Sequence, residues 1–207
     1  MYPFRITEAC FRLASEETAE YVTENMLDAK SVTDSLTLLD TTLDKAPKEG
    51  LYLEFGVFSG TTINFIADKV ETTVHGFDSF SGLPEDWLYT PKGHFDKGGT
   101  PPEVRDTVKL HVGWFDDTLP GFIKEHSGPV AFIHIDSDLY SSAKTILYSL
   151  KDQIQKGTVI QFDEYFNFPG WKSQEFKAFQ EFINDTGLKY EYIGYTTSGF
   201  SASVVIC

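Results

Sequence analysis

Apolar residues recur along this chain with two different spacings, and the alternation of the two predicts its structural elements. Short apolar runs typical of buried strands alternate with longer stretches in which apolar residues return every three or four positions. Such an alternation is typical of a parallel sheet that is covered by helices on both faces. The expected strands are residues 51–55, 73–77, 108–112, 130–135 and 158–162, and the expected helices between them are residues 61–69, 119–125 and 139–153.

The two ends of the chain depart from this alternation. The first 46 residues read as two helices, over 9–27 and 31–43, the second marked by Val32, Leu36 and Leu39 at helical spacing. After a helix over 173–184, two strand-like runs at 190–195 and 202–206 follow each other across a short polar turn, which indicates an antiparallel hairpin.

The expected fold class is therefore α/β and Rossmann-like, with a mostly parallel sheet closed by a C-terminal antiparallel hairpin and preceded by N-terminal helices. We expect a single domain over residues 1–207, with a helical cap over 1–46 and an α/β core over 47–207. An ordinary dinucleotide-binding domain would reach its last strand through another crossover helix instead.

Composition restricts the partners and the location of the protein. The net charge of −14 repels phosphate backbones and anionic lipids, so neither nucleic acid nor a membrane surface is an expected partner. No run of 18 apolar residues is present, and the first residues lack the apolar region of a secretory signal. The two cysteines, Cys10 and Cys207, show no metal-binding spacing. A cytoplasmic location follows by default.

A glycine-containing turn after the first strand of the expected core indicates a ligand site. Gly56 permits a sharp turn, and Gly60 permits close approach of a ligand to the backbone at the start of the next helix. Glu54, just inside the strand end, suits an amine-bearing ligand such as the methionine part of S-adenosylmethionine and disfavours a pyrophosphate. The spacing also differs from G-x-G-x-x-G, which makes an NAD-dependent oxidoreductase the weakest alternative. A plain tight turn is the structural alternative.

A second carboxylate strengthens the prediction of an adenosyl ligand. Asp78 lies at the end of the second core strand, where an acid commonly accepts hydrogen bonds from ribose hydroxyls. The alternative is an ordinary turn aspartate beside Ser79 and Ser81. Together, the glycines and the two acids favour an adenosyl cofactor.

Five stretches carry a resemblance to a known family. They are residues 54–60 (EFGVFSG), 76–84 (GFDSFSGLP), 113–120 (GWFDDTLP), 134–140 (HIDSDLY) and 162–165 (FDEY). In this order they resemble the successive motifs of the macrocin and mycinamicin sugar O-methyltransferases, which are class I S-adenosylmethionine-dependent enzymes. The resemblance covers roughly residues 20 to 207. It implies the fold and the methyl donor, and it leaves the acceptor open.

The resemblance also implies roles for individual residues. Gly56 and Gly60 would cradle the methionine part, Asp78 would bind ribose, and Trp114 with Phe115 would lie along adenine. A homodimer, with the N-terminal helices over a neighbour's cleft, is a further implication. The full expected cofactor set is Glu54, Gly56, Ser59, Gly60, Thr61, Asp78, Ser79, Gly113, Trp114, Phe115 and Asp136.

Three acids are expected to converge at the carboxyl-terminal edge of the sheet. Asp136 ends one core strand, and Asp163 with Glu164 ends the next. Neighbouring strands lie about 4.8 Å apart, so these carboxylates either share protons or hold a cation. Oxygen ligands without cysteine favour Mg²⁺, with Mn²⁺ or Ca²⁺ as alternatives. The structural alternative is a solvated acidic rim. Glu164 stands where the family usually has aspartate, and its longer side chain can still reach a cation.

The expected reaction is methyl transfer to a hydroxyl of a small molecule, a sugar or a phenolic diol. Asp136 is the first candidate for the general base, with Asp138, His134 and His94 as further candidates. Asp138 has a structural alternative as a helix N-cap, His134 as an inward-facing strand residue, and His94 as an exposed loop histidine. The long connection over 84–104 reads as a lid or acceptor pocket, with Phe166, Phe168 and Trp171 beside it.

Two other functions remain compatible with the sequence. One is a methyltransferase that uses the same cofactor without a metal. The other is a cofactor-binding module without catalysis, because Glu164 departs from the family pattern and Leu139 stands where catechol O-methyltransferases carry a lysine. Turnover after chelation of divalent metals separates the first of these from the metal-assisted enzyme.

Overall fold

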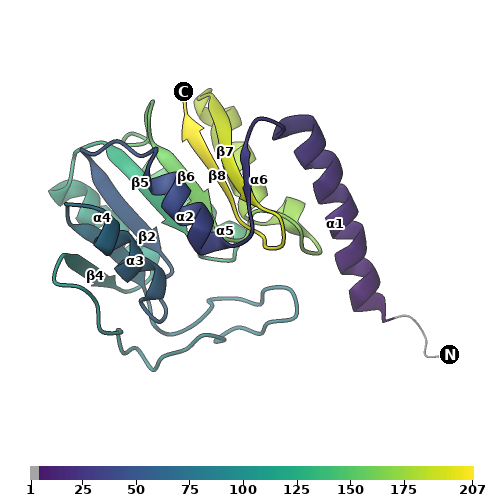
Figure 1. Cartoon of the computed structure of the whole chain (residues 1–207). Coiled ribbons are helices and arrows are strands. Elements are labelled where there is room, and N and C mark those ends of the chain that lie inside the picture. Colours follow the sequence, from purple (N-terminus) through teal and green to yellow (C-terminus); the bar gives the residue numbers. More distant parts are fainter. Residues whose placement is uncertain (1–4) are drawn as a thin grey trace.

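The computed structural model describes residues 5–207. They form one mixed sheet with helices on both faces (Figure 1). The sheet has 8 strands in the order β1-β7-β8-β6-β5-β2-β3-β4. All neighbouring strands are parallel except the pairs β6–β8 and β7–β8, which are antiparallel. The expected α/β fold with a C-terminal antiparallel hairpin is therefore confirmed. The strands are β1 (Lys30–Val32), β2 (Leu51–Phe55), β3 (Val74–Asp78), β4 (Val108–Val112), β5 (Val130–Ile135), β6 (Val159–Phe162), β7 (Tyr190–Thr196) and β8 (Ala202–Ile206).

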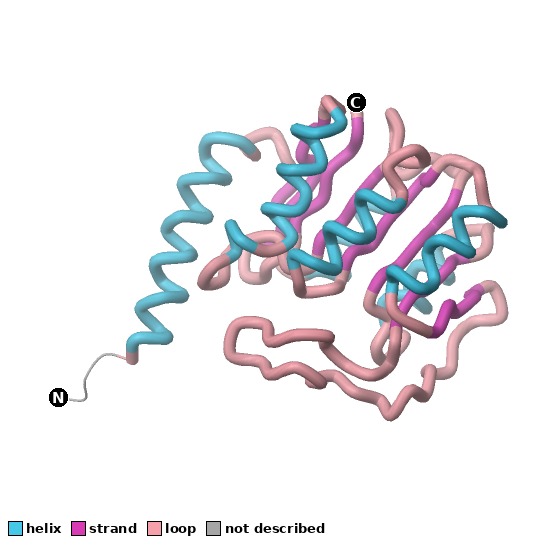
Figure 2. Tube along the Cα trace, turned by 180° about the vertical axis from the view of Figure 1, so that it is seen from behind, coloured by secondary structure: helices cyan, strands magenta, loops and turns pink. Residues whose placement is uncertain are grey.

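The helices form two layers on the sheet. Figure 1 shows α2 and α3 on the near face, and Figure 2, seen from behind, shows α4, α5 and α6 side by side on the other face. Every residue of β5 is buried, as expected for a central strand covered on both faces. The helices are α1 (Ile6–Asn25), α2 (Ser35–Leu43), α3 (Thr61–Lys69), α4 (Phe115–Glu125), α5 (Tyr140–Ser149), α6 (Glu175–Thr186) and the short 3₁₀ helix η1 (Trp171–Ser173).

The N-terminal segment differs from the two expected helices. The expected helix over 31–43 begins only at Ser35, because the side chain of Asp34 caps α2 by accepting the Thr37 amide at 2.9 Å. The preceding residues form β1, in which Val32 pairs with Thr196 of β7. A strand of 3 residues is too short to leave a recognisable pattern of apolar residues in the sequence. It forms through its parallel pairing with the edge of β7.

Helix α1 lies at the edge of the molecule, and Figure 1 shows its N-terminal half extending away from the sheet. Its C-terminal half is anchored by Tyr21, whose hydroxyl is 2.6 Å from that of Tyr192 and whose ring packs edge-on against Trp171 and Phe176. Within residues 5–207, no helix is both long and apolar enough to cross a membrane.

Two more element boundaries were predicted wrongly. Helix α4 begins at Phe115 instead of residue 119 and continues through Pro120, a residue that in sequence usually marks a helix start. Helix α5 ends at Ser149 instead of residue 153, and it begins at Tyr140, directly after its N-cap residue Leu139. The long connection over 79–107 runs along the carboxyl-terminal edge of the sheet, where Figure 1 shows it below the strands.

Candidate active site

A cavity of about 730 Å³ opens at the carboxyl-terminal edge of the sheet. Its wall is built from the residues that follow four parallel strands, because such strands all end at one edge. These residues are Gly56 after β2, Asp78 and Ser79 at β3, Asp136 to Asp138 after β5, and Glu164 after β6. Trp114 and Phe115, at the start of α4, complete this side of the wall.

The glycine turn after β2 fits against the loop after β5. Gly56 has φ +92°, and a Cβ atom built on it would lie 1.7 Å from the carbonyl oxygen of Asp136. No other residue type fits there without moving the backbone, which accounts for the glycine that the sequence analysis singled out.

Asp78 holds this glycine turn in place. Its Oδ2 atom accepts the amides of Val57 at 2.9 Å and Phe58 at 2.8 Å, and its Oδ1 atom accepts the amide of Phe80 at 2.7 Å. The turn-aspartate interpretation therefore describes part of its role. Asp78 also lines the cavity beside Ser79, and the predicted contact with ribose stays a prediction.

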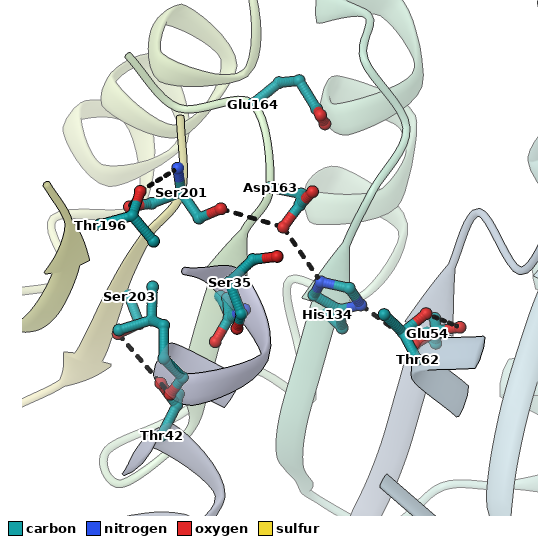
Figure 3. Close-up of polar contacts among 12 residues, drawn as sticks. Ser35, Thr42, Glu54, Thr62, His134, Asp163, Glu164, Thr196, Ser201 and Ser203 are labelled. Carbon is teal, nitrogen blue, oxygen red and sulfur yellow. Dashed lines mark hydrogen bonds and ion pairs between the residues drawn. The ribbon is translucent and has the colours of Figure 1, made fainter. Parts of the chain in front are cut away.

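Several residues of the expected cofactor set lie outside the cavity wall. Glu54 is fully buried, where its carboxylate accepts the Thr62 hydroxyl at 3.0 Å and lies 3.0 Å from Nδ1 of His134, as Figure 3 shows. Its two partners are Thr62, in the first turn of α3, and His134, in β5, so the carboxylate is used inside the fold. The others outside the wall are Ser59, Gly60, Thr61 and Gly113.

The three acids predicted at the sheet edge do converge. Ligand oxygens of Asp136, Asp163 and Glu164 lie within 4.8 Å of one another, and Asp136 and Glu164 face the cavity. We call these three residues the acid cluster. Burial and the neighbouring carboxylates raise the pKa of Asp136 and of Glu164 well above their usual values.

Asp163 differs from its two neighbours because it has polar partners. Its Oδ1 atom accepts the Ser201 hydroxyl at 3.0 Å and lies 3.8 Å from Nε2 of His134 (Figure 3). Burial alone would raise the pKa of Asp163, but the interactions with His134 and Ser201 lower it below its usual value. His134 is buried between Asp163 and Glu54, which agrees with its interpretation as an inward-facing strand residue and removes it from the candidates for the base.

The acid cluster offers oxygen atoms close enough together to serve as ligands of one cation. Within residues 5–207, no lysine or arginine forms an ion pair with any of its members. The Oε2 atom of Glu164 is buried without a hydrogen-bond partner, and Glu164 as a whole is only 8% exposed. A solvated acidic rim does not describe such a residue. The unpartnered Oε2 atom of Glu164, together with the nearby carboxylates of Asp136 and Asp163, is a set of oxygen ligands that suits a hard ion such as Mg²⁺.

Asp138 is not the N-cap of α5. That position belongs to Leu139, and the first helical amide, of Tyr140, is accepted by the side chain of Gln174 at 3.0 Å. Asp138 has φ +63°, lines the cavity and makes no hydrogen bond through its carboxylate to any described residue. Burial and the charge of Asp163 raise the pKa of Asp138 to about 7. The N-cap expectation fails because the helix begins one residue later than an Asp138 cap requires, and Gln174 accepts its first amide instead.

The connection over 79–107 covers the cavity, as expected of a lid or acceptor pocket, and Pro84, Trp87, Lys92 and Phe95 line the wall. His94 is exposed and does not line the cavity, and its ring packs edge-on against that of Phe95. The aromatics after β6 belong to the core instead of the cavity. Phe166, Phe168 and Trp171 are each at most 1% exposed.

Sequence reasoning missed Glu175, a fully buried carboxylate next to the acid cluster. The available signal was its place on the apolar face of α6, at helical spacing from Phe179 and Phe182. An acid on such a face is uncommon unless it is hydrogen-bonded.

Comparisons with known proteins place these features in context. Residues 53–165 match the sequence model of a family described as a methyltransferase domain. A 95-residue stretch is 30% identical to 8-demethyl-8-(2,3-dimethoxy-alpha-L-rhamnosyl)-tetracenomycin-C 4'-O-methyltransferase of Streptomyces olivaceus. That match covers 46% of this chain and 33% of the relative, so the chain aligns with only about a third of that protein.

Solved structures share the fold at low sequence identity. The calicheamicin methyltransferase CalS11 is 22% identical with a TM-score of 0.62, and the match covers 82% of this chain and 76% of CalS11. The O-methyltransferase TomG from Streptomyces achromogenes, solved with S-adenosylmethionine, is 16% identical with a TM-score of 0.50. That match covers 95% of this chain and 89% of TomG.

Proposed function

This chain belongs to the methyltransferase domain family, and on that premise we propose that it transfers a methyl group from S-adenosylmethionine to a hydroxyl of a small molecule. The acceptor is a sugar or a phenolic diol, and a divalent metal ion assists. One observation carries the proposal. One cavity of about 730 Å³ is lined by Gly56 and Asp78 on one side. Asp136 and Glu164, two members of the acid cluster, also line it.

The methyl donor lies on the side of the cavity formed by β2, β3 and α4. The turn at Gly56 leaves room for the methionine part, and Asp78 and Ser79 offer acceptors to the ribose hydroxyls. Trp114 is 39% exposed at the wall, so its indole is free to stack on adenine.

The acceptor lies on the side of the acid cluster. Asp136, Asp163 and Glu164 would hold the metal ion, and a bound ion would act as a Lewis acid that lowers the pKa of the acceptor hydroxyl. The acceptor oxygen attacks the methyl carbon, the carbon–sulfur bond breaks with its electron pair going to sulfur, and S-adenosylhomocysteine leaves. Asp138 takes the hydroxyl proton, because its carboxylate faces the cavity and has no partner among the described residues. Asp136, the first candidate from the sequence, serves as a metal ligand.

The relatives support the acceptor class in general terms. The matched Streptomyces olivaceus protein is named for methylating a rhamnosyl group, which favours a sugar hydroxyl over a phenol. The aromatic side chains of Trp87 and Phe95 in the cavity wall suit the apolar face of a sugar ring. A homodimer with the N-terminal helices over a neighbour's cleft, and a cytoplasmic location, stay predictions.

Ligand-induced stabilisation tests the cofactor. S-adenosylhomocysteine at 100 times its dissociation constant should stabilise the wild-type protein by about 2.7 kcal/mol and raise its melting temperature. Asp78→Ala should lose this shift while its circular dichroism stays native-like. Asp152→Ala, at an exposed site far from the cavity wall, is the matched control and should keep the shift. A well-folded wild-type protein that gives neither a shift nor calorimetric heat would contradict the proposal.

Chelation tests the metal. Turnover of a diol or glycoside panel should fall after EDTA treatment and return with Mg²⁺. Undiminished turnover after thorough chelation would favour the metal-independent methyltransferase. Cofactor binding without turnover on any acceptor would favour a binding module.

A further inference from the structure

Glu175 is the first residue of α6, and its carboxylate lies in the interior of the protein at 0% exposure. Burial of a carboxylate is costly unless hydrogen bonds compensate for the lost water. No lysine or arginine among the described residues pairs with it. Its partners are therefore the reason that an acid is tolerated at this position.

Those partners belong to two different loops. The Oε1 atom accepts the amide and the hydroxyl of Ser137, each at 3.3 Å, and the Oε2 atom accepts the amide of Glu164 at 3.3 Å. Ser137 follows Asp136 on the loop after β5, and Glu164 follows Asp163 on the loop after β6. One side chain thus connects both loops that carry the acid cluster.

We propose that Glu175 is a positioning residue, which holds the loops after β5 and β6 at the separation that lets Asp136, Asp163 and Glu164 bind one divalent cation. This role rests on the metal-assisted function proposed above. The three carboxylates lie within 4.8 Å of one another, and without a cation this proximity costs free energy, either as repulsion between charges or as proton uptake. The acid cluster therefore does not itself hold the two loops together, whereas Glu175 connects them through the amides of Ser137 and Glu164 and does not line the cavity.

Metal affinity, measured without catalysis, tests the role. The Glu175→Gln variant keeps the volume of the side chain but replaces one acceptor oxygen with an NH₂ group, which cannot accept the Glu164 or Ser137 amide. Mn²⁺ binding, followed by electron paramagnetic resonance of the free ion, should weaken at least tenfold in this variant. Ser137→Ala removes only the hydroxyl partner and should weaken binding two- to threefold.

Glu181→Gln is the matched control. Glu181 lies on the same helix and undergoes the same exchange of a carboxyl for an amide group, but its partners are Lys177, Lys144 and Tyr140 on the protein surface. Its Mn²⁺ affinity should stay within twofold of the wild type. S-adenosylhomocysteine binding, measured on every sample, reports that the fold and the cofactor site are intact.

The outcomes separate this role from the proposed function. A tenfold loss in Glu175→Gln, with cofactor binding retained and the control unchanged, supports the positioning role. Mn²⁺ affinity within twofold of the wild type in Glu175→Gln would overturn it. If the wild-type protein binds S-adenosylhomocysteine but no Mn²⁺, the metal and the role of Glu175 both fail while the methyltransferase assignment stands.

Discussion

Substitution of Gly56 by alanine should damage both stability and ligand binding, because the new Cβ atom would meet backbone. The carbonyl oxygen of Asp136 lies 1.7 Å from the ideal Cβ position, whereas real contacts of this kind stay above 3.0 Å. The residue also has φ +92°, a conformation that costs an L-amino acid about 1 kcal/mol. Separating the two backbone segments adds an overpacking cost of about 1–3 kcal/mol.

We therefore expect Gly56→Ala to lower the free energy of unfolding by about 2–4 kcal/mol. In urea unfolding this corresponds to a midpoint about 1–2 M lower. Because the displaced loop carries Asp136, the affinity for S-adenosylhomocysteine should fall as well.

Gly93→Ala is the matched control for this prediction. Gly93 has a similar φ of +82°, but an added Cβ would meet nothing within 4 Å. It should therefore show only the conformational cost of about 1 kcal/mol. If the two variants unfold at urea midpoints that agree within error, the contact between the glycine turn and the Asp136 loop does not constrain the site, and the reasoning is refuted.

Three further predictions concern pH, capping and catalysis. Burial and the neighbouring imidazoles lower the pKa of His75 to about 4, whereas an unfolded histidine has a pKa near 6.5. The neutral His75 side chain therefore contributes its full stability above pH 6.5, and this contribution is lost as the pH falls toward 4. The wild-type protein should lose about 2 kcal/mol more than His75→Phe between pH 6.5 and 4.5 in urea unfolding, and parallel pH profiles would contradict this. Asp34→Ala removes the cap of α2 and should cost about 1 kcal/mol, with an unchanged urea midpoint as the contrary result. Asp138→Asn should reduce kcat about 100-fold or more with S-adenosylhomocysteine affinity within twofold, and retained turnover would exclude Asp138 as the base.

The elements of the core could be predicted from sequence because their signals are local. Strands β2, β3, β5 and β6 lie within a residue of their expected bounds, since continuous apolar runs between turn residues leave few alternatives. Strand β1 could not be predicted, because the edge of β7 selects it and its own residues do not. The start of α4 was predicted at residue 119, next to Pro120, because proline is common at the first position of a helix. The helix begins earlier, at Phe115, and Pro120 lies inside it.

The sequence alone determined that Asp136, Asp163 and Glu164 meet, because parallel strands end at a common edge. It also indicated that Gly56 permits a sharp turn, but only the structure shows that a Cβ atom there would meet the backbone of Asp136. Only the tertiary structure decided which acids face the cavity and which are used inside the protein. Glu54 lies in the interior and Asp138 lies at the wall, since side-chain direction depends on the register of the strand and on the backbone conformation after it. Those properties are set by packing between distant segments, and no local pattern encodes them.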